Sequence, residues 1–363
     1  MNDIMKENYN DGYYHISKDV LDYPDATVII VWSHRGPGKT YGGLRYPYHR
    51  FKTLYMKRTN KDVATICEYE GDIDFDPSPW KPLNRDFGIH VKPRLIKDGI
   101  GAFYDADEDG NPSGAVINYV ASLNALKTIK GIDLSDIEWM IFDEFIPLAG
   151  EVVKRAEGEM LLDIYETLSR DRLKRGRAPL KLILFANAEE ISTHITNTLE
   201  VVDTMAEMIA QDKHIYYDAD RGILFHHLTE KEYPVHGSGE VGMMRVMRGT
   251  SWALKSYGGE FSKNDFSNVM NISIKGMTCL YHLHYRRKND AYIYFNPKTG
   301  LYYMTGIRGN FKKSYNLDLE NDQKRFFMDH CCDLRDKCIN NKMKFRKYSY
   351  YDLIINYTKI YEL

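Results

Sequence analysis

Residues 27–43 read Thr-Val-Ile-Ile-Val-Trp-Ser-His-Arg-Gly-Pro-Gly-Lys-Thr-Tyr-Gly-Gly, and this stretch decides the fold. Its first six residues are β-branched or aromatic, as in a parallel strand that is buried on both faces. Glycines at positions 36 and 38 then predict a tight loop, and a helix is expected from about residue 39 to 51. A strand, a glycine-rich loop and a helix in this order predict a phosphate-binding loop.

The chemistry expected of this loop follows from its residue types. Glycine allows backbone N–H groups to point at phosphate oxygens, Lys39 reaches the β- and γ-phosphates, and Thr40 offers its hydroxyl to Mg²⁺. The strict Walker A pattern has glycine where this chain has Ser33, so an ordinary strand-to-helix turn stays open as the alternative. The predicted cofactors are therefore ATP and Mg²⁺, and the predicted binding residues are Ser33, His34, Arg35, Gly36, Pro37, Gly38, Lys39 and Thr40.

A second apolar stretch, Ile137–Glu144, ends in two acids. In a phosphate-loop enzyme such a Walker B strand is expected beside the first strand, where Asp143 would hold Mg²⁺ through water or the Thr40 hydroxyl. Glu144 would then orient or deprotonate the attacking water. An acidic strand-to-loop turn is the alternative.

Further candidates lie around residue 180. A helix is expected over 157–174, and its end carries the arginine cluster Arg170, Arg172, Arg175 and Arg177. One of these would act as an arginine finger on a neighbouring subunit, although a solvated helix end explains the cluster equally well. The next strand, over 180–186, leads into Asn187, which is placed either to sense the γ-phosphate or simply to form a turn.

Composition limits the class of protein. The chain has 363 residues, of which 43% are hydrophobic and 28% charged, so we expect a globular protein with more than one domain. No apolar run approaches the roughly 20 residues of a membrane span, which predicts no membrane partner and a cytoplasmic location. We expect a P-loop ATPase domain over 1–198, a linker or lid subdomain with a hairpin over 199–249, and a basic α+β domain over 250–363.

Charge is unevenly distributed along the chain. Lys and Arg number 49 against 51 Asp and Glu overall, but 17 against 9 from residue 271 onward and 32 against 42 before it. A basic C-terminal part is expected to face nucleic acid or another acidic partner, while a merely solvated surface stays open. The candidate DNA contacts are Arg286, Arg287, Lys288, Arg308, Lys312, Lys313, Lys342, Lys344, Arg346 and Lys347.

Taken together, these motifs resemble the DNA-encapsidation ATPases of small short-tailed phages with protein-primed linear genomes. The resemblance is carried by Arg35-Gly36-Pro37-Gly38-Lys39-Thr40, Ile141-Phe142-Asp143-Glu144-Phe145, Ser169-Arg170-Asp171-Arg172 and Ala186-Asn187-Ala188. It implies an ATP-hydrolysing ring, usually of five subunits, which drives double-stranded DNA through the portal or connector of a procapsid in the host cytoplasm. It also implies that Arg170 is the finger that acts in trans.

The fold class predicted is α/β. It comprises a P-loop domain of the additional-strand catalytic-glutamate type with a RecA/FtsK-like sheet, a small linker subdomain and an α+β domain. For that last domain the resemblance implies a ribonuclease-H-like fold that lacks nuclease acids. Other functions stay open: a helicase-like ATPase, a small-molecule kinase, or a scaffold that merely holds nucleotide.

Overall fold

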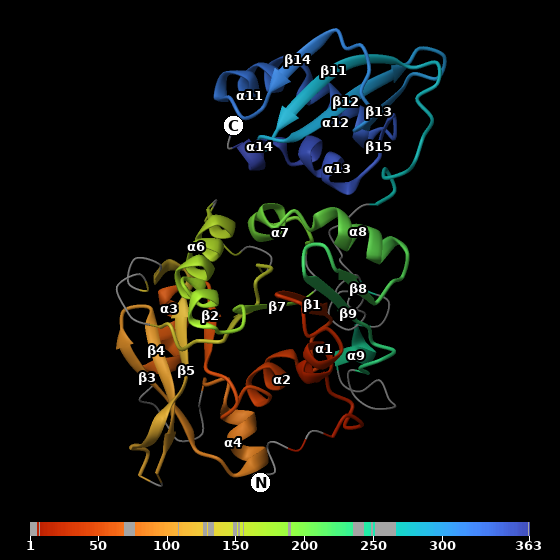
Figure 1. Cartoon of the computed structure of the whole chain (residues 1–363). Coiled ribbons are helices and arrows are strands. Elements are labelled where there is room, and N and C mark those ends of the chain that lie inside the picture. Colours follow the sequence, from red (N-terminus) through yellow and green to blue (C-terminus); the bar gives the residue numbers. More distant parts are fainter. Residues whose placement is uncertain are drawn as a thin grey trace. The chain divides into compact units, whose positions relative to one another are not determined.

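The computed structural model describes residues 6, 8–68, 77–107, 109–125, 129, 134–147, 151, 153–154, 156–187, 190–234, 243–247, 250, 266–361 and 363. The chain divides into two compact units (Figure 1). The N-terminal unit comprises Met1–Leu199 and Gln211–Lys263, and the C-terminal unit comprises Glu200–Ala210 and Asn264–Leu363. No helix among the described residues is both long and apolar enough to span a lipid bilayer.

The N-terminal unit is built on a nine-stranded sheet, as far as the described residues show. Six neighbouring strands in it are parallel, and antiparallel strands lie at both edges. The strand order is β3 (Val91–Lys97), β4 (Ile100–Ala106), β5 (Pro112–Ser122), β2 (Thr53–Lys57), β6 (Trp139–Asp143), β7 (Lys181–Asn187), β1 (Val28–Ser33), β9 (Ile223–Leu228) and β8 (Ile215–Asp218).

Strand β1 is buried along its length, as the apolar run predicts. The expectation that the Asp-Glu strand lies beside it is wrong, because β7 lies between β1 and β6 and pairs in parallel with both. All three strands end at the same edge of the sheet, so the loops that follow β1, β6 and β7 still meet there.

Two helices expected from the sequence form in the N-terminal unit, and both end earlier than expected. Helix α2 (Lys39–Arg45) is shorter than predicted because Pro47 has no backbone N–H, so the helical hydrogen bonds stop after Tyr46, whose N–H donates to the Gly42 carbonyl. Helix α6 (Glu157–Ser169) ends early because Arg170 has extended backbone, with ψ of 129°. The other α-helices among the described residues of this unit are α1 (Ile16–Asp22), α3 (Asn60–Cys67), α4 (Lys81–Phe87), α7 (His194–Thr198) and α9 (Met243–Val246).

The hairpin expected in a linker subdomain forms as β8 and β9, but it belongs to the main sheet. Strand β9 pairs in parallel with β1 from Val28 to Ser33. Only α8 (Val202–Ala210) leaves this unit, and Asp203 in it accepts hydrogen bonds from the backbone and hydroxyl of Ser349 in the C-terminal unit, at 2.9 and 2.8 Å. The structure thus divides the chain into two units, whereas three segments were expected.

The C-terminal unit contains a five-stranded sheet among its described residues, in the order β14 (Lys313–Asn316), β11 (Thr278–Tyr285), β12 (Asn289–Asn296), β13 (Leu301–Thr305) and β15 (Met343–Phe345). Strands β11, β12 and β13 are antiparallel, while each edge strand is parallel to its neighbour. Alternate residues such as Leu283 and Ile293 pack against helices in the larger of two apolar clusters of described residues, and Cys279, Tyr292 and Tyr294 form the smaller one. Its helices are α11 (Glu320–Phe326), α12 (Cys332–Ile339), α13 (Tyr348–Ile355) and α14 (Tyr357–Tyr361).

Candidate nucleotide-binding site

The loop after β1 has the backbone that phosphate binding requires. Gly36 and Gly38 have φ angles of 105° and 90°, which residues with a side chain rarely adopt. Gly38 directly precedes the first turn of α2. The loop is fastened from outside by the backbone N–H of Tyr14, which donates to the Pro37 carbonyl at 2.7 Å.

The side chain of Lys39 is buried and surrounded mainly by neutral groups. Its ammonium nitrogen donates to the Ser33 hydroxyl, to the His34 carbonyl at 3.3 Å and to the Asn187 Oδ1 at 3.2 Å. Burial lowers the pKa of Lys39 to about 8, although the carboxylates of Asp143 and Glu144 oppose the shift. A buried cation in such surroundings is a favourable site for an anion.

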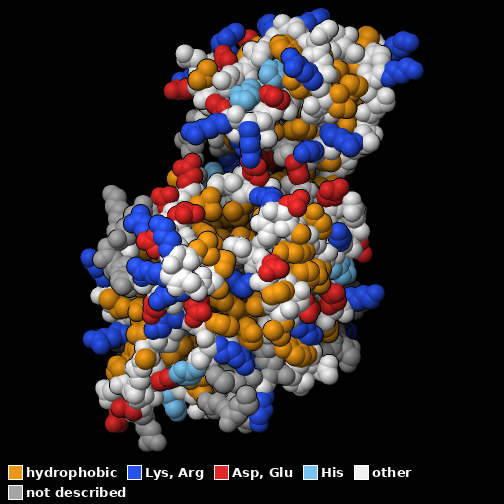
Figure 2. All heavy atoms as spheres, viewed as in Figure 1, with side chains coloured by type: hydrophobic (Ala, Val, Ile, Leu, Met, Phe, Trp, Pro, Cys, Tyr) orange, Lys and Arg blue, Asp and Glu red, His pale blue; other side chains and the backbone are white. Residues whose placement is uncertain are grey.

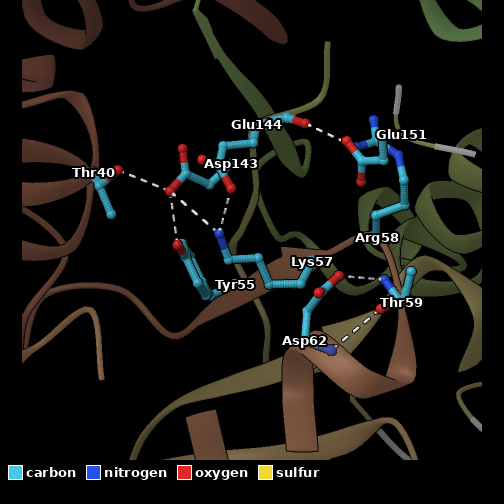
Figure 3. A network of polar contacts seen from close by, with 9 residues as sticks. All are labelled: Thr40, Tyr55, Lys57, Arg58, Thr59, Asp62, Asp143, Glu144 and Glu151. Atoms are coloured by element: carbon cyan, nitrogen blue, oxygen red, sulfur yellow. Dashed lines mark hydrogen bonds and ion pairs between the residues drawn. The ribbon is translucent and has the colours of Figure 1, made fainter. Parts of the chain in front are cut away.

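Asp143 lies at the centre of a second set of contacts, drawn in Figure 3. Its Oδ2 accepts hydrogen bonds from the Thr40 hydroxyl at 2.8 Å and from the Tyr55 hydroxyl at 2.7 Å. A hydroxyl oxygen and a carboxylate side by side are ligands that Mg²⁺ prefers, and Mg²⁺ is usually bound by one or two such groups together with substrate phosphates. These residues therefore fit the predicted metal. No group of three or more His, Cys, Asp or Glu in the described part of the chain could hold a metal ion by itself.

Glu144 follows directly after β6, with φ of 59°, an unfavourable backbone conformation for a residue that has a side chain. Its Oε2 lies 3.0 Å from the ammonium nitrogen of Lys57, which is also 3.9 Å from Asp143 (Figure 3). The buried guanidinium of Arg58 donates to the backbone carbonyl of Glu144 at 3.3 Å and to that of Phe145 at 2.8 Å. The two basic residues therefore fix both the side chain and the backbone of Glu144.

Two adjoining cavities follow the loop. One, of about 430 Å³, is lined by the loop residues and extends to Asn187. The other, of about 720 Å³, extends past Tyr55 and Lys57 toward Asp62. Both cavities are lined by Thr40, Pro79, Asp143 and Glu144. The predicted phosphate-binding, metal-binding and water-activating residues Lys39, Thr40, Asp143 and Glu144 therefore line the smaller cavity together.

The remaining loop residues differ in their environment. Arg35 is exposed and lines the smaller cavity, whereas the hydroxyl of Ser33 is buried and donates to the His34 carbonyl at 2.5 Å. Burial and the nearby Lys39 lower the pKa of His34 to about 4, so its imidazole is neutral at physiological pH. Of these side chains, Arg35 and Lys39 therefore carry the positive charge of the loop.

Arg170 does not lie at this site in its own chain. Two residues further on, the buried Arg172 donates to the carbonyls of Ala178 and Ile137, which precede β7 and β6. That edge of the sheet is opposite the nucleotide loop, one strand length away, or about 17 Å for the five residues of β6. Arg170 itself is exposed. Any contact between Arg170 and nucleotide therefore requires a second subunit.

The basic residues proposed from the charge asymmetry all lie in the C-terminal unit, but in three separate places. Residues 286–288 form the β11–β12 turn, Arg308 and Lys312 lie between β13 and β14, and residues 342–347 surround the edge strand β15. Figure 2 shows Lys and Arg spread over the visible face of this unit rather than gathered in one patch. Some are paired with acids, since Lys288 lies 2.9 Å from Glu200 and Lys347 lies 3.7 Å from Asp203.

Sequence reasoning missed Tyr55, Lys57 and Arg58. Tyr55 lies within β2, Lys57 ends it and Arg58 follows it. This strand carries no motif, and the three residues reach the site only because β2 pairs with β6. The strand expected over 53–57 could have indicated them. A parallel strand that ends at the same edge of the sheet places its last residues beside Asp143.

Comparison with known proteins gives the fold of the whole chain. No protein-family model matches it, and no curated protein sequence matches it. Among solved structures, a chain of the bacteriophage phi29 viral genome packaging motor assembly is 16% identical, with a TM-score of 0.62 over 96% of this chain and 99% of that one. A chain of the phi28 DNA packaging motor is 17% identical, with a TM-score of 0.59 over 98% of this chain and 99% of that one. The chain therefore has the fold of these packaging-motor chains across both units.

Proposed function

We propose that this chain is the ATP-hydrolysing subunit of a viral motor that moves double-stranded DNA into a procapsid. The observation that carries the proposal is the meeting of Lys39, Asp143 and Glu144 around one hollow, in a chain with the fold of packaging-motor chains over nearly its whole length. The fold supports the role as a motor subunit, and the arrangement of the three side chains supports the hydrolysis of ATP.

The proposed reaction is transfer of the γ-phosphoryl group of ATP to water. Lys39 binds the β- and γ-phosphates, and the side-chain amide of Asn187, already 3.2 Å from Lys39, contacts the γ-phosphate. Thr40 and Asp143 would hold Mg²⁺, which neutralises negative charge on the phosphates. Glu144 orients the attacking water and accepts its proton, and the products are ADP and phosphate.

Lys57 and Arg58 act as positioning residues in this proposal. General-base catalysis depends on holding the base within hydrogen-bond reach of the proton that it accepts. The ion pair with Lys57, at 3.0 Å, and the Arg58 hydrogen bond to the Glu144 carbonyl, at 3.3 Å, restrict where the carboxylate of Glu144 can lie. Arg58 is itself held by Glu157 at 2.9 Å.

Strand order supports the finer assignment of the fold. The strand β7 between β1 and β6 fits the additional-strand catalytic-glutamate type of P-loop domain, and β9, β1, β7, β6 and β2 correspond to its central sheet. In the C-terminal unit, three antiparallel strands with a parallel strand beside β11 fit a ribonuclease-H-like fold, although β15 beside β13 departs from it. We propose that this unit binds DNA and does not cleave it.

The proposed assembly of subunits is based on the position of Arg170. Because it lies across the sheet from its own nucleotide loop, we propose a homo-oligomeric ring, most simply a pentamer, in which Arg170 completes a neighbour's site. Such a ring would act at the portal vertex of a procapsid, in the host cytoplasm, with the portal or connector as its protein partner.

The experiment that tests this function measures ATP hydrolysis with and without double-stranded DNA. We expect DNA to stimulate turnover, Lys39→Ala to abolish nucleotide binding, and Glu144→Gln to keep binding while hydrolysis is lost. Phosphate transfer to a small molecule with no effect of DNA would favour a kinase, and strand separation would favour a helicase. Hydrolysis by Glu144→Gln at the parental rate would overturn the catalytic assignment.

A further inference from the structure

A pair of tyrosines borders the phosphate-binding loop outside the residues assigned so far. The ring of Tyr13 lies against Gly38, so closely that a Cβ atom on Gly38 would be 3.1 Å from the Tyr13 Cδ1. Tyr41 stacks on Tyr13, with ring centroids 6.2 Å apart and an interplanar angle of 29°. Tyr13 is nevertheless 52% exposed, so burial in the core does not explain its position.

The segment that carries Tyr13 is held firmly against the loop. The backbone N–H of Tyr13 donates to the Asp11 carboxylate at 2.9 Å, and that of Tyr14 donates to the Pro37 carbonyl at 2.7 Å. The Tyr14 hydroxyl donates to Asp19 at 2.7 Å, and this buried carboxylate also lies 2.9 Å from the Nδ1 of His226 on β9. The exposed ring is therefore fixed in advance, which lowers the entropic cost of a contact with ligand.

The smaller cavity is lined by Tyr41, and Tyr13 adjoins it through its stacking on Tyr41. Lys39, Asn187 and Glu144 line the same cavity where the terminal phosphate belongs. Tyr41 comes directly after Thr40, lines the same cavity and is anchored by its hydroxyl, which donates to Asp86 at 3.1 Å. A nucleotide whose terminal phosphate lies at Lys39 would therefore extend its nucleoside toward Tyr41 and Tyr13.

We propose that Tyr13 and Tyr41 stack on the base of the bound nucleoside triphosphate; this inference rests on the proposed function. An aromatic ring stacks on any base, because every base has a π-face. Base recognition by this pair therefore favours nucleotide over bare phosphate but discriminates weakly between ATP and GTP.

Three variants of the full chain test the proposal by isothermal titration with ATP, GTP and inorganic tripolyphosphate. Tyr13→Ala should weaken ATP and GTP binding alike, by about tenfold or more, and leave tripolyphosphate binding unchanged. Tyr13→Phe should bind all three ligands as the parent does, because it keeps the ring. Tyr9→Ala is the matched control, since Tyr9 is a 41% exposed tyrosine of the same segment whose ring packs edge-on against His15, with centroids 5.2 Å apart.

The outcomes separate this inference from the proposed function. If Tyr13→Ala binds ATP with the parental affinity, the inference is overturned, while the proposed function as an ATP hydrolase is unaffected. Equal losses for ATP and tripolyphosphate also overturn it, because they show that Tyr13 supports the loop instead of the base. A parent chain that binds neither ligand overturns the proposed function and this inference together.

Discussion

The ammonium nitrogen of Lys39 lies 3.2 Å from the Oδ1 of Asn187, and this contact joins the phosphate-binding loop to the end of the neighbouring strand β7. With its oxygen engaged by Lys39, the amide of Asn187 has its NH₂ group available for a γ-phosphate oxygen. The first prediction concerns this amide. Asn187→Ala should lower kcat by about 10²-fold, the usual cost of removing one donor to developing negative charge, with ADP affinity nearly unchanged.

Steady-state hydrolysis and ADP titration measure the two effects. Asn187→Asp is the matched comparison, because it keeps the shape of the side chain but places a second negative charge beside the phosphates. It should weaken ATP binding as well as turnover. Parental kcat in Asn187→Ala would show that the residue only completes a turn.

The second prediction concerns pH. Burial lowers the pKa of Lys39 to about 8, and a bound phosphate favours the charged ammonium, so ATP binding should take up a proton near and above pH 8. Affinity should then fall above pH 8, by up to about tenfold per pH unit. Between pH 8 and the ordinary lysine pKa, the unfolded chain holds more protons than the folded chain. The contribution of this residue to stability therefore rises with pH in that window.

Calorimetry in two buffers of different ionisation enthalpy measures the proton uptake. Lys39→Arg serves as the control, because arginine stays protonated throughout this range. Its residual affinity should show no step near pH 8. An affinity of the parent chain that is constant from pH 7 to 9.5 would contradict the prediction.

Local patterns predicted the parts of the site that lie on single segments. Three features could be predicted because each depends only on neighbouring residues: the buried run before the loop, the two glycines, and the acids at the end of β6. The order of the strands in the sheet could not be predicted from such local patterns. The insertion of β7 between β1 and β6, and the placing of Lys57 beside Glu144, depend on pairing between segments more than 40 residues apart.

The arginine cluster after α6 illustrates the same limit. Arg170 and Arg172 look alike in the sequence, yet one is exposed and the other is buried against backbone carbonyls. Spacing alone cannot separate them, because the chain leaves helical backbone at Arg170 and reverses at Asp171, where φ is 60°.

The third prediction uses this difference. Arg172→Ala should lower the free energy of unfolding by about 3 kcal/mol, because it leaves the buried carbonyl of Ile137, and that of Ala178, without their charged donor. Arg170→Ala should change it by less than about 0.5 kcal/mol, as is usual for an exposed residue. Urea denaturation of the two variants measures both values. A similar loss in both would show that Arg170 also supports the fold.

The fourth prediction concerns the residues that bind DNA. Arg287, Arg308 and Lys312 are exposed and form no ion pair with any described residue, so their charges are available to phosphates. Reversing all three to Glu should weaken binding uniformly across DNA sequences and reduce the steepness of its salt dependence.

Reversal of Lys288 and Lys347, which are paired with Glu200 and Asp203, is the matched control and should cost less. Binding is measured by fluorescence anisotropy at several salt concentrations. Unchanged binding after reversal of Arg287, Arg308 and Lys312 would show that these residues do not contact DNA. If reversal of the candidates in all three places, residues 342–347 included, also leaves binding unchanged, DNA binds elsewhere, most simply on loops of the N-terminal unit.

The last prediction concerns Arg170 and separates a ring motor from a self-contained hydrolase. If its guanidinium completes a neighbour's site, Arg170→Ala should lower turnover by about 10³-fold or more and leave nucleotide affinity nearly intact. Subunit mixing makes the result specific. An Arg170→Ala chain keeps its own Lys39 and Glu144, while a Glu144→Gln chain keeps its own Arg170, so mixed rings contain interfaces where an intact site meets an intact finger.

Those interfaces should recover part of the activity when the two inactive variants are mixed. A mixture of Lys39→Ala with Glu144→Gln is the control and should recover none, because every chain in it carries a lesion in its own site. If the Arg170→Ala mixture also recovers nothing at any ratio, the arginine does not act across an interface. Arg170, which follows α6 near the sheet edge opposite its own loop, would then have no catalytic role, and the argument for an obligate ring would be lost.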